Sequence, residues 1–144
     1  MHLFDKAQQH AEAWVRDMMA ALPTEDPKKA LHALRAGLHA LRDRLPINEA
    51  AQLAAQFPVL IRGLFFEGWQ PADKPLRIRN QIDFQNLVRE KYGPRSDAGA
   101  QEILTAVFRV LEKHVSRGEI TDVMMSLPED LVSLVTGRRE ASLE

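Results

Sequence analysis

Apolar residues recur every three or four positions along most of the chain, which is the spacing of one face of an α-helix. In the first part of the chain they form one stripe: Leu3, Ala7, Ala11, Trp14, Met18 and Leu22. A second stripe comprises Leu31, Leu34, Leu38, Leu41 and Leu45. β-branched residues are sparse, and no strand-like alternation of apolar and polar positions accompanies these stripes. The pattern therefore predicts an all-α fold.

Prolines and one capping residue divide the first half into four expected helices. Pro23 ends the first helix, and Asp26-Pro27 is typical of a helix start, because proline is tolerated in the first turn. The second helix stops at Pro46. A third helix is expected at about residues 48–56, and Pro58 opens a fourth.

The second half carries its own helix signals. Gly93 followed by proline predicts the end of a helix. Ser116 with Glu119, and Ser126 with Glu129, have the spacing of capping boxes, in which a serine and a glutamate satisfy each other's backbone N–H groups. Two further helix starts are therefore expected there.

The two halves share one apolar pattern at an offset of 70 residues. The matched pairs are Trp14 with Phe84, Met18 with Val88, Leu22 with Tyr92, Leu34 with Leu104, Leu38 with Phe108, Leu41 with Leu111, Leu45 with Val115, Leu53 with Val123, Phe57 with Leu127, Ile61 with Leu131 and Leu64 with Leu134. Glu49 also meets Glu119, and Pro58 meets Pro128. We therefore predict a helical bundle of two tandem repeats, each of about three to four helices. Residues 1–66 form the first repeat, 67–80 a linker and 81–144 the second repeat, within one compact domain.

Composition agrees with an ordinary globular protein. The chain has 144 residues, of which 45% are hydrophobic and 27% charged, so a single hydrophobic core is expected. The absence of cysteine excludes disulfides, thiolate metal ligands and cysteine nucleophiles, and it suits the cytoplasmic location that we expect. No apolar run approaches the roughly 20 residues of a membrane span, and the first residues lack the pattern of a secretory signal.

The net charge of −1 argues against nucleic acid as a partner, because proteins that contact many phosphates usually carry excess positive charge. Basic residues occur only in short clusters, which we interpret as solvated helix faces and loops: Lys28-Lys29, Arg42 with Arg44, Arg77 with Arg79, and Arg138-Arg139. Nucleic-acid binding is therefore the least expected function.

Two phrases of the sequence resemble a known family. They are LHALRDRLPINEAAQLAAQFPVLIRGLFFEGWQP, residues 38–71, and FRVLEKHVSRGEITDVMMSLPEDL, residues 108–131. The combination of LRDRLP, the FP and LP helix starts, and EGW-x-P in this order resembles the bacterial domain of unknown function 2267, over about residues 14–135. The resemblance implies an all-helical bacterial protein with an internal duplication. It brings no activity, cofactor or catalytic residue.

No arrangement of polar residues predicts catalysis or a metal site. His32 and His39 are seven residues apart on one expected helix, which is about 10 Å, and the i,i+4 spacing of a zinc-binding helix is absent. Glu49 and Glu119 lie near helix starts, where negative charge is favourable, and His114 lies near a helix end, where positive charge is favourable. These roles are structural. We expect no metal, no cofactor and no catalytic residues, and we lean against an enzyme.

The segment EGWQPADKPLRIRN, residues 67–80, is the best candidate for binding, because long loops in compact domains often carry function. Our candidate binding residues are Phe66, Trp69, Arg77 and Arg79, since exposed tryptophan and arginine are favoured at binding hot spots. In a structural alternative, Trp69 and the phenylalanines fix the linker onto the bundle.

Arg77 and Arg79 also have two interpretations: they bind an acidic partner, or they neutralise Glu67 and Asp73. The chain is accordingly expected to be a non-enzymatic helical module that binds another protein or itself. The alternative is a small-molecule site, sensory or catalytic, in a cleft between the repeats, where arginine recognises a carboxylate or phosphate.

Overall fold

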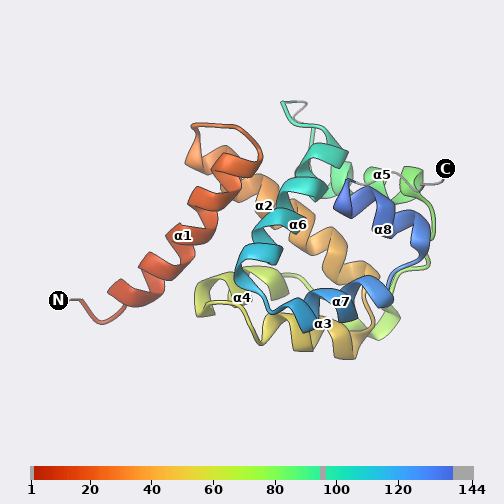
Figure 1. Cartoon of the computed structure of the whole chain (residues 1–144), viewed down its shortest axis with the longest axis horizontal. Helices are drawn as coiled ribbons and strands as arrows, with labels where there is room; N and C mark the ends of the chain where they lie inside the picture. Colours follow the sequence, from red (N-terminus) through yellow and green to blue (C-terminus); the bar gives the residue numbers. More distant parts are fainter. Residues whose placement is uncertain (1, 95–96, 138–144) are drawn as a thin grey trace.

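The computed structural model describes residues 2–94 and 97–137. These residues contain eight α-helices, one 3-10 turn at Pro71–Asp73 and no strand, which confirms the all-α prediction (Figure 1). The helices are α1 (Asp5–Ala21), α2 (Pro27–Arg44), α3 (Ile47–Ala54), α4 (Val59–Phe66), α5 (Gln81–Tyr92), α6 (Ala100–His114), α7 (Arg117–Met125) and α8 (Glu129–Thr136). Residues 138–144, which our predicted second repeat includes, and with them Arg138-Arg139, lie outside the described residues.

The helices form a bundle around two long central helices, α2 and α6, which contact each other (Figure 1). α1 packs on both of them, and α5 packs on α2 and α6. The short helices α3 and α7 contact each other at one end of the bundle, while α4 packs on α1 and α2, and α8 packs on α5 and α6. Among the described helices, none combines the length and apolar character needed to cross a membrane.

Several helix ends follow from single residues, as the sequence predicts. The carboxylate of Asp26 accepts a hydrogen bond from the backbone N–H of Lys28 at 3.0 Å, and Pro27 is the first residue of α2. Pro58 directly precedes α4. α5 ends at Gly93, whose φ of 91° is left-handed and therefore favours glycine.

The two predicted capping boxes are not found as such. At the start of α7, Ser116 Oγ accepts from the backbone N–H of Glu119, but the N–H of Ser116 donates to Gln56 Oε1 instead of the glutamate. Ser126 caps the C-terminal end of α7 and does not start α8, whose preceding residue is Pro128. The Glu119 carboxylate is therefore not engaged in a cap.

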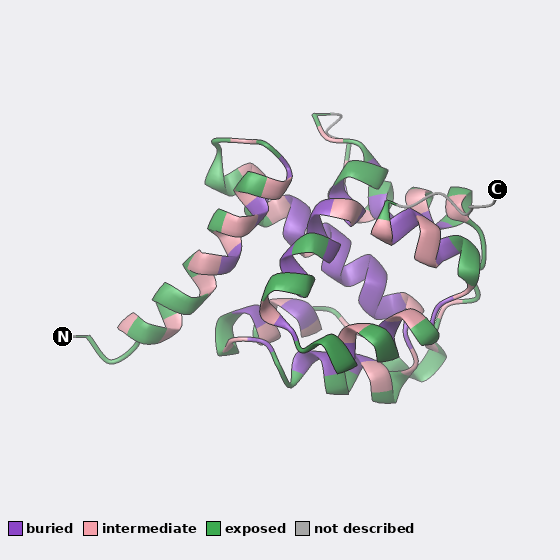
Figure 2. Cartoon of the chain, viewed as in Figure 1, coloured by how far each residue is buried: buried purple, intermediate pink, exposed green. Residues whose placement is uncertain are grey.

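The apolar positions that define the 70-residue pattern form the core. All the paired residues are buried except Leu64, which is half-buried, and Figure 2 shows the buried surface following α2 through the middle of the bundle. At the contact between the central helices, a Cβ added to Gly37 would lie 2.6 Å from Val107 Cγ2. Glycine at this position therefore allows α2 and α6 to approach closely.

Candidate functional site

A buried polar cluster on α2 holds the segment that follows α4. Arg42 is only 2% exposed, and its Nη1 donates to the backbone oxygens of Phe65 at 2.8 Å and Glu67 at 2.7 Å. The backbone oxygen of Asp43 accepts from the N–H of Leu76 at 2.8 Å. Our interpretation of Arg42 as part of a solvated helix face is therefore wrong, because the free carbonyls at the end of α4 need a buried donor.

Asp43 and His39 complete this cluster. The Asp43 carboxylate accepts from Arg42 Nε at 2.8 Å and from Lys91 Nζ at 2.7 Å. Burial raises the pKa of Asp43, but the hydrogen bonds and charges of Arg42 and Lys91 outweigh burial and hold the pKa below its usual value. Burial lowers the pKa of His39 to about 4, so its neutral ring donates from Nε2 to the oxygen of Leu64 at 2.7 Å.

Two of the predicted binding residues pack against the bundle. The Trp69 ring lies 5.1 Å from the Phe66 ring, and Phe66 lies 5.2 Å from the buried Phe65, measured between centroids. Trp69 is half-buried, and its Nε1 has no hydrogen-bond partner among the described residues. These contacts fit the structural alternative, in which Trp69 and the phenylalanines fix the linker onto the bundle.

The other two predicted residues, Arg77 and Arg79, line a separate hollow of about 520 Å³ together with Arg44. Neither Arg77 nor Arg79 forms an ion pair with any residue that the structure describes. Burial first, and then the charge of Arg79, lower the pKa of Arg44. Trp69 and Phe66 do not line this hollow, so the four predicted residues do not form one site.

The neutralising role that we considered for Arg77 and Arg79 is not found. Glu67 pairs with Arg35, and Asp73 pairs with Lys74, each with an N···O distance of 2.9 Å. The positive charge of the hollow is therefore not balanced by these carboxylates.

An apolar hollow of about 330 Å³, which sequence reasoning missed, lies where α1, α2 and α4 meet. Its lining residues are Gln8, Ala11, Glu12, Val15, Leu31, Leu60, Ile61 and Leu64. Leu60 is 52% exposed, and the neighbouring Val59 is also exposed. The signal was present in VLIRGLFF, since a helix so rich in apolar residues cannot turn all of them towards one core.

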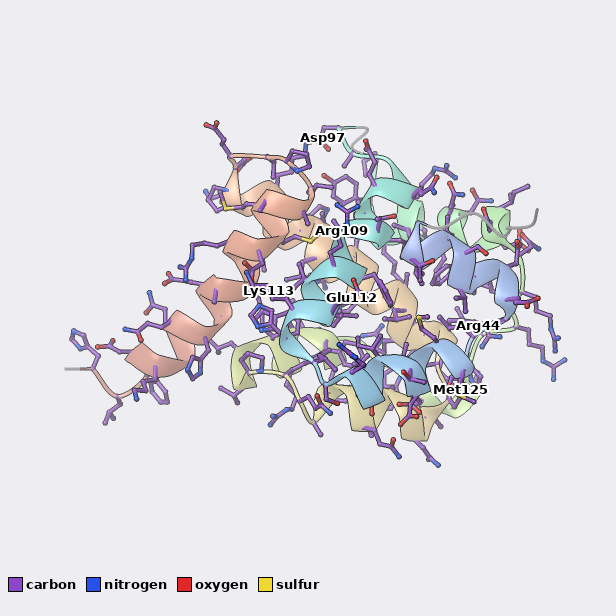
Figure 3. The ribbon with its side chains drawn as sticks, viewed as in Figure 1. Arg44, Asp97, Arg109, Glu112, Lys113 and Met125 are labelled. Atoms are coloured by element: carbon purple, nitrogen blue, oxygen red, sulfur yellow. The ribbon has the colours of Figure 1, made fainter. Side chains whose placement is uncertain are left out.

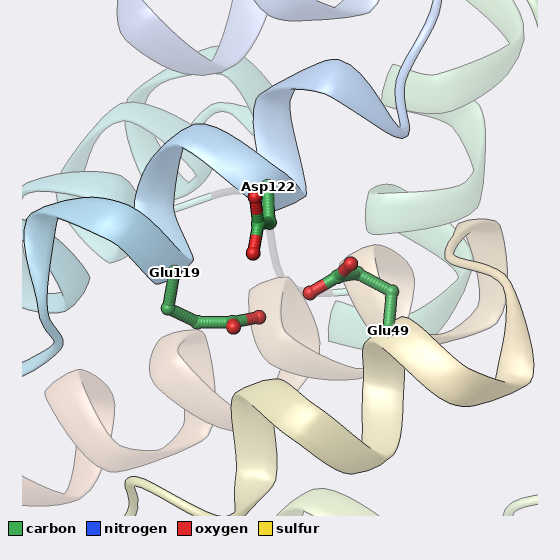
Figure 4. A group of neighbouring side chains, drawn as sticks. All are labelled: Glu49, Glu119 and Asp122. Carbon is green, nitrogen blue, oxygen red and sulfur yellow. The ribbon is translucent and has the colours of Figure 1, made fainter.

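Three carboxylates converge where α3 and α7 meet: Glu49 from α3, and Glu119 and Asp122 from α7 (Figure 4). One oxygen from each lies within 4.8 Å of the others. Burial, followed by a hydrogen bond with Glu49 and the charges of Glu49 and Asp122, raises the pKa of Glu119 to about 8. We had explained Glu49 and Glu119 as separate helix-start charges. Their match at the 70-residue offset was the signal that pointed to a contact.

The histidines serve different contacts. His32 Nε2 lies 2.6 Å from the oxygen of Tyr92 at the end of α5, and His39 Nε2 lies 2.7 Å from the oxygen of Leu64 near the end of α4. His114 Nε2 lies 2.6 Å from the carboxylate of Asp17 on α1, and its ring stacks on Trp14. These nitrogens hold the helices together and do not converge.

The fold and these sites define a small helical bundle with several candidate binding surfaces and no catalytic constellation that we recognise in the described part of the chain. The chain belongs to the DUF2267 family, described as an uncharacterized conserved protein, whose sequence model matches residues 11–134. This confirms the resemblance seen in the sequence. A search of curated proteins finds no match. The family carries no assigned activity, so function must be argued from the sites.

Proposed function

We propose that the protein is a non-enzymatic helical module that associates with a second copy of itself through the apolar hollow between α1, α2 and α4. The observation that carries this proposal is the hollow itself, whose lining is almost entirely apolar and open to solvent. Apolar surface of this kind gains free energy when a partner covers it.

The chain also offers an occupant for this hollow. Leu3 is 93% exposed and Phe4 is 76% exposed, and both precede α1, whose first turns project from the body of the bundle (Figure 1). A two-fold pair uses the same surface of both copies, so a projecting apolar end beside an apolar hollow is self-complementary.

Sedimentation velocity over a range of concentrations tests this proposal. We expect the wild-type chain to be a dimer, and Phe4→Glu and Leu60→Glu to be monomers with unchanged helical circular dichroism. Met125→Glu is the matched control, because Met125 is 81% exposed on α7, away from the hollow (Figure 3). A monomeric wild-type chain, or dimers of all variants alike, would rule out this interface.

We further infer that the two halves are copies of one helical unit, in a cytoplasmic bacterial protein. The helix limits support the duplication: α2 and α6 end at 44 and 114, α3 and α7 begin at 47 and 117, and α4 and α8 begin at 59 and 129, each differing by 70. The contact of Gly37 with Val107 has the same offset. The absence of cysteine supports the location.

A second candidate function is binding of a small anion in the hollow of Arg44, Arg77 and Arg79. Three guanidinium groups with few acidic partners favour a carboxylate or phosphate, because arginine forms directional, charge-assisted hydrogen bonds to both. We expect inorganic phosphate to raise the melting temperature of the wild-type chain.

The double variant Arg77→Ala with Arg79→Ala should keep the fold and lose this effect. Arg16→Ala, which removes an exposed arginine on α1, should keep it. Trp69→Ala should leave phosphate binding intact, since Trp69 does not line the hollow. Equal phosphate effects in the wild type and the double variant would refute an anion site here.

A further inference from the structure

We propose that Glu49, Glu119 and Asp122 form a binding site for a hard divalent cation, of the Ca²⁺, Mg²⁺ or Mn²⁺ class, which joins α3 to α7. The sequence predicts no metal site, because it lacks cysteine and its histidines lack the i,i+4 spacing of a zinc-binding helix. Carboxylate oxygens are the ligands that these hard cations prefer.

The geometry suits one ion. Oxygens that share a cation at about 2.1–2.5 Å stand roughly 3–5 Å apart, and the three carboxylates each offer one oxygen within 4.8 Å of the others. Glu119 and Asp122 are three residues apart on α7, so they lie on one face of the helix, and Glu49 reaches the same point from α3 (Figure 4). No backbone shift is needed to bring the three groups together.

Burial of Glu119 is the independent observation that points to a ligand. Glu119 is only 7% exposed, and its Oε2 is buried without a hydrogen-bond partner in the described structure. Glu49 Oε2 is in the same state. None of the three carboxylates forms an ion pair with a described lysine, arginine or histidine. A buried carboxylate oxygen without a partner is costly, and a cation would remove that cost.

The half-formed cap explains why Glu119 is free to bind. In a complete capping box its carboxylate would accept from the N–H of Ser116, but Gln56 Oε1 accepts that hydrogen bond at 2.8 Å. Glu119 instead turns towards Glu49 (Figure 4). Gln56 follows α3, so the contact that joins the two short helices also releases this carboxylate.

Asp122 opens the site to solvent. It is exposed, whereas Glu119 is buried and Glu49 half-buried, so an ion can enter from the Asp122 side and complete its coordination with water.

Isothermal titration calorimetry of the full chain tests the proposal, with Ca²⁺, Mg²⁺ and Mn²⁺ each added separately to protein cleared of metal by chelation. We expect one cation per chain for at least one of these ions. The same ion should raise the melting temperature, because it binds only the folded chain.

Two variants and one control test whether these carboxylates bind the ion. Glu119→Gln keeps the shape of the side chain but removes its charge, and it should weaken cation binding by at least about tenfold. Substitution of residues that only hydrogen-bond to metal ligands already causes losses of this size. Asp122→Asn changes an exposed residue, so the fold should survive, and it should also weaken binding. Glu112→Gln, at an exposed position on α6, should bind as the wild type does (Figure 3).

The proposal fails if none of the three ions binds the wild-type chain. It also fails if Glu119→Gln and Asp122→Asn both bind as tightly as the wild type. In either case the three carboxylates do not form a cation site.

Discussion

The central helices α2 and α6 pack against each other but differ in where their charged residues lie. Three ionisable residues of α2 are buried: His39, Arg42 and Asp43. The residues of α6 that lie 70 positions further on are Arg109, Glu112 and Lys113. All three are exposed, and Figure 3 shows them on the outer side of α6.

The difference comes from what lies on each helix. The end of α4 and the residue that follows it lie against α2, where the backbone oxygens of Phe65 and Glu67 accept hydrogen bonds from Arg42. On α6, Arg109 lines an open hollow of about 440 Å³, and Glu112 and Lys113 are exposed. Charges there remain in water. Whether a charged side chain is buried in this fold therefore depends on the segment that packs over it and not on the helix that carries it.

The largest effect should come from breaking the cluster on α2. Arg42→Ala leaves the oxygens of Phe65 and Glu67 without a donor, and it should lower the free energy of unfolding by about 3–5 kcal/mol. Glu112→Ala, the matched change on α6, should stay within about 0.5 kcal/mol of the wild type. Chemical denaturation measures both. Similar losses of unfolding free energy in Arg42→Ala and Glu112→Ala would contradict the difference in burial between α2 and α6.

The next largest effect concerns pH. His39 stays neutral in the folded chain because burial lowers its pKa to about 4, whereas its unfolded pKa is 6.5. The unfolded state therefore binds more protons, and stability falls as the pH drops from about 6.5 towards 4, by about 2–3 kcal/mol. Glu119, whose pKa is raised, acts in the opposite direction, so a comparison between variants is required.

His39→Gln isolates this contribution, because glutamine can still donate to the oxygen of Leu64 but does not titrate. The stability difference between the wild type and His39→Gln should shift in favour of the variant as the pH falls through this window. The exposed His10, changed to glutamine, should show no such trend. A pH-independent difference for His39→Gln would show that His39 does not stay neutral in the folded chain.

A smaller effect is expected where the two central helices touch. A Cβ at position 37 would meet Val107 Cγ2 at 2.6 Å, so Gly37→Ala should cost about 1 kcal/mol after the helix-propensity gain of alanine is subtracted. Gly63→Ala, on α4 with no atom within 4 Å of the added Cβ, should instead stabilise the fold by about 0.5–1 kcal/mol.

Thermal unfolding of the two alanine variants should therefore give shifts of opposite sign. Gly37→Ala should cost less when it is made in a Val107→Ala background than in the wild type, since that background lacks the methyl group that the new Cβ meets. Stabilisation by Gly37→Ala would show that the helices can separate at no cost.

Much of the fold was predictable because the helix pattern and the prolines are local signals. Asp26-Pro27, Pro58 and Gly93 each set a helix end through their own backbone or side chain. The buried state of Arg42 was not predictable in this way. It depends on carbonyls at Phe65 and Glu67, more than 20 residues away in the chain.

The candidate sites also depend on contacts between residues that are distant in the chain, which local signals do not predict. Trp69 and Arg77 were singled out by residue type, but the structure places them in different surroundings, because only the path of the linker decides which side chains meet. The carboxylates of Glu49 and Glu119 meet across two helices. Their convergence follows from packing α3 on α7, which no local pattern encodes.

The smallest expected change in the free energy of unfolding concerns an exposed ion pair, which is compared here with a more buried one. Each pair joins a central helix to an outer neighbour. Lys91 of α5 pairs with Asp43 of α2 at 2.7 Å, and Lys113 of α6 pairs with Asp17 of α1 at 2.9 Å. The Asp43 side chain is 5% exposed, whereas the Lys113 side chain is 65% exposed. Water and salt screen an exposed pair far more than a buried carboxylate.

Lys113→Ala should therefore lower the free energy of unfolding by at most about 0.5 kcal/mol, and high salt should abolish the effect. His114, whose Nε2 lies 2.6 Å from the Asp17 carboxylate, remains as a partner and limits the loss further. Lys91→Ala should cost more and persist in salt, because Asp43 stays buried. Urea denaturation at low and high salt measures both variants. If Lys113→Ala lowered the free energy of unfolding as much as Lys91→Ala does, burial would not explain the difference between the ion pairs of α2 and α6.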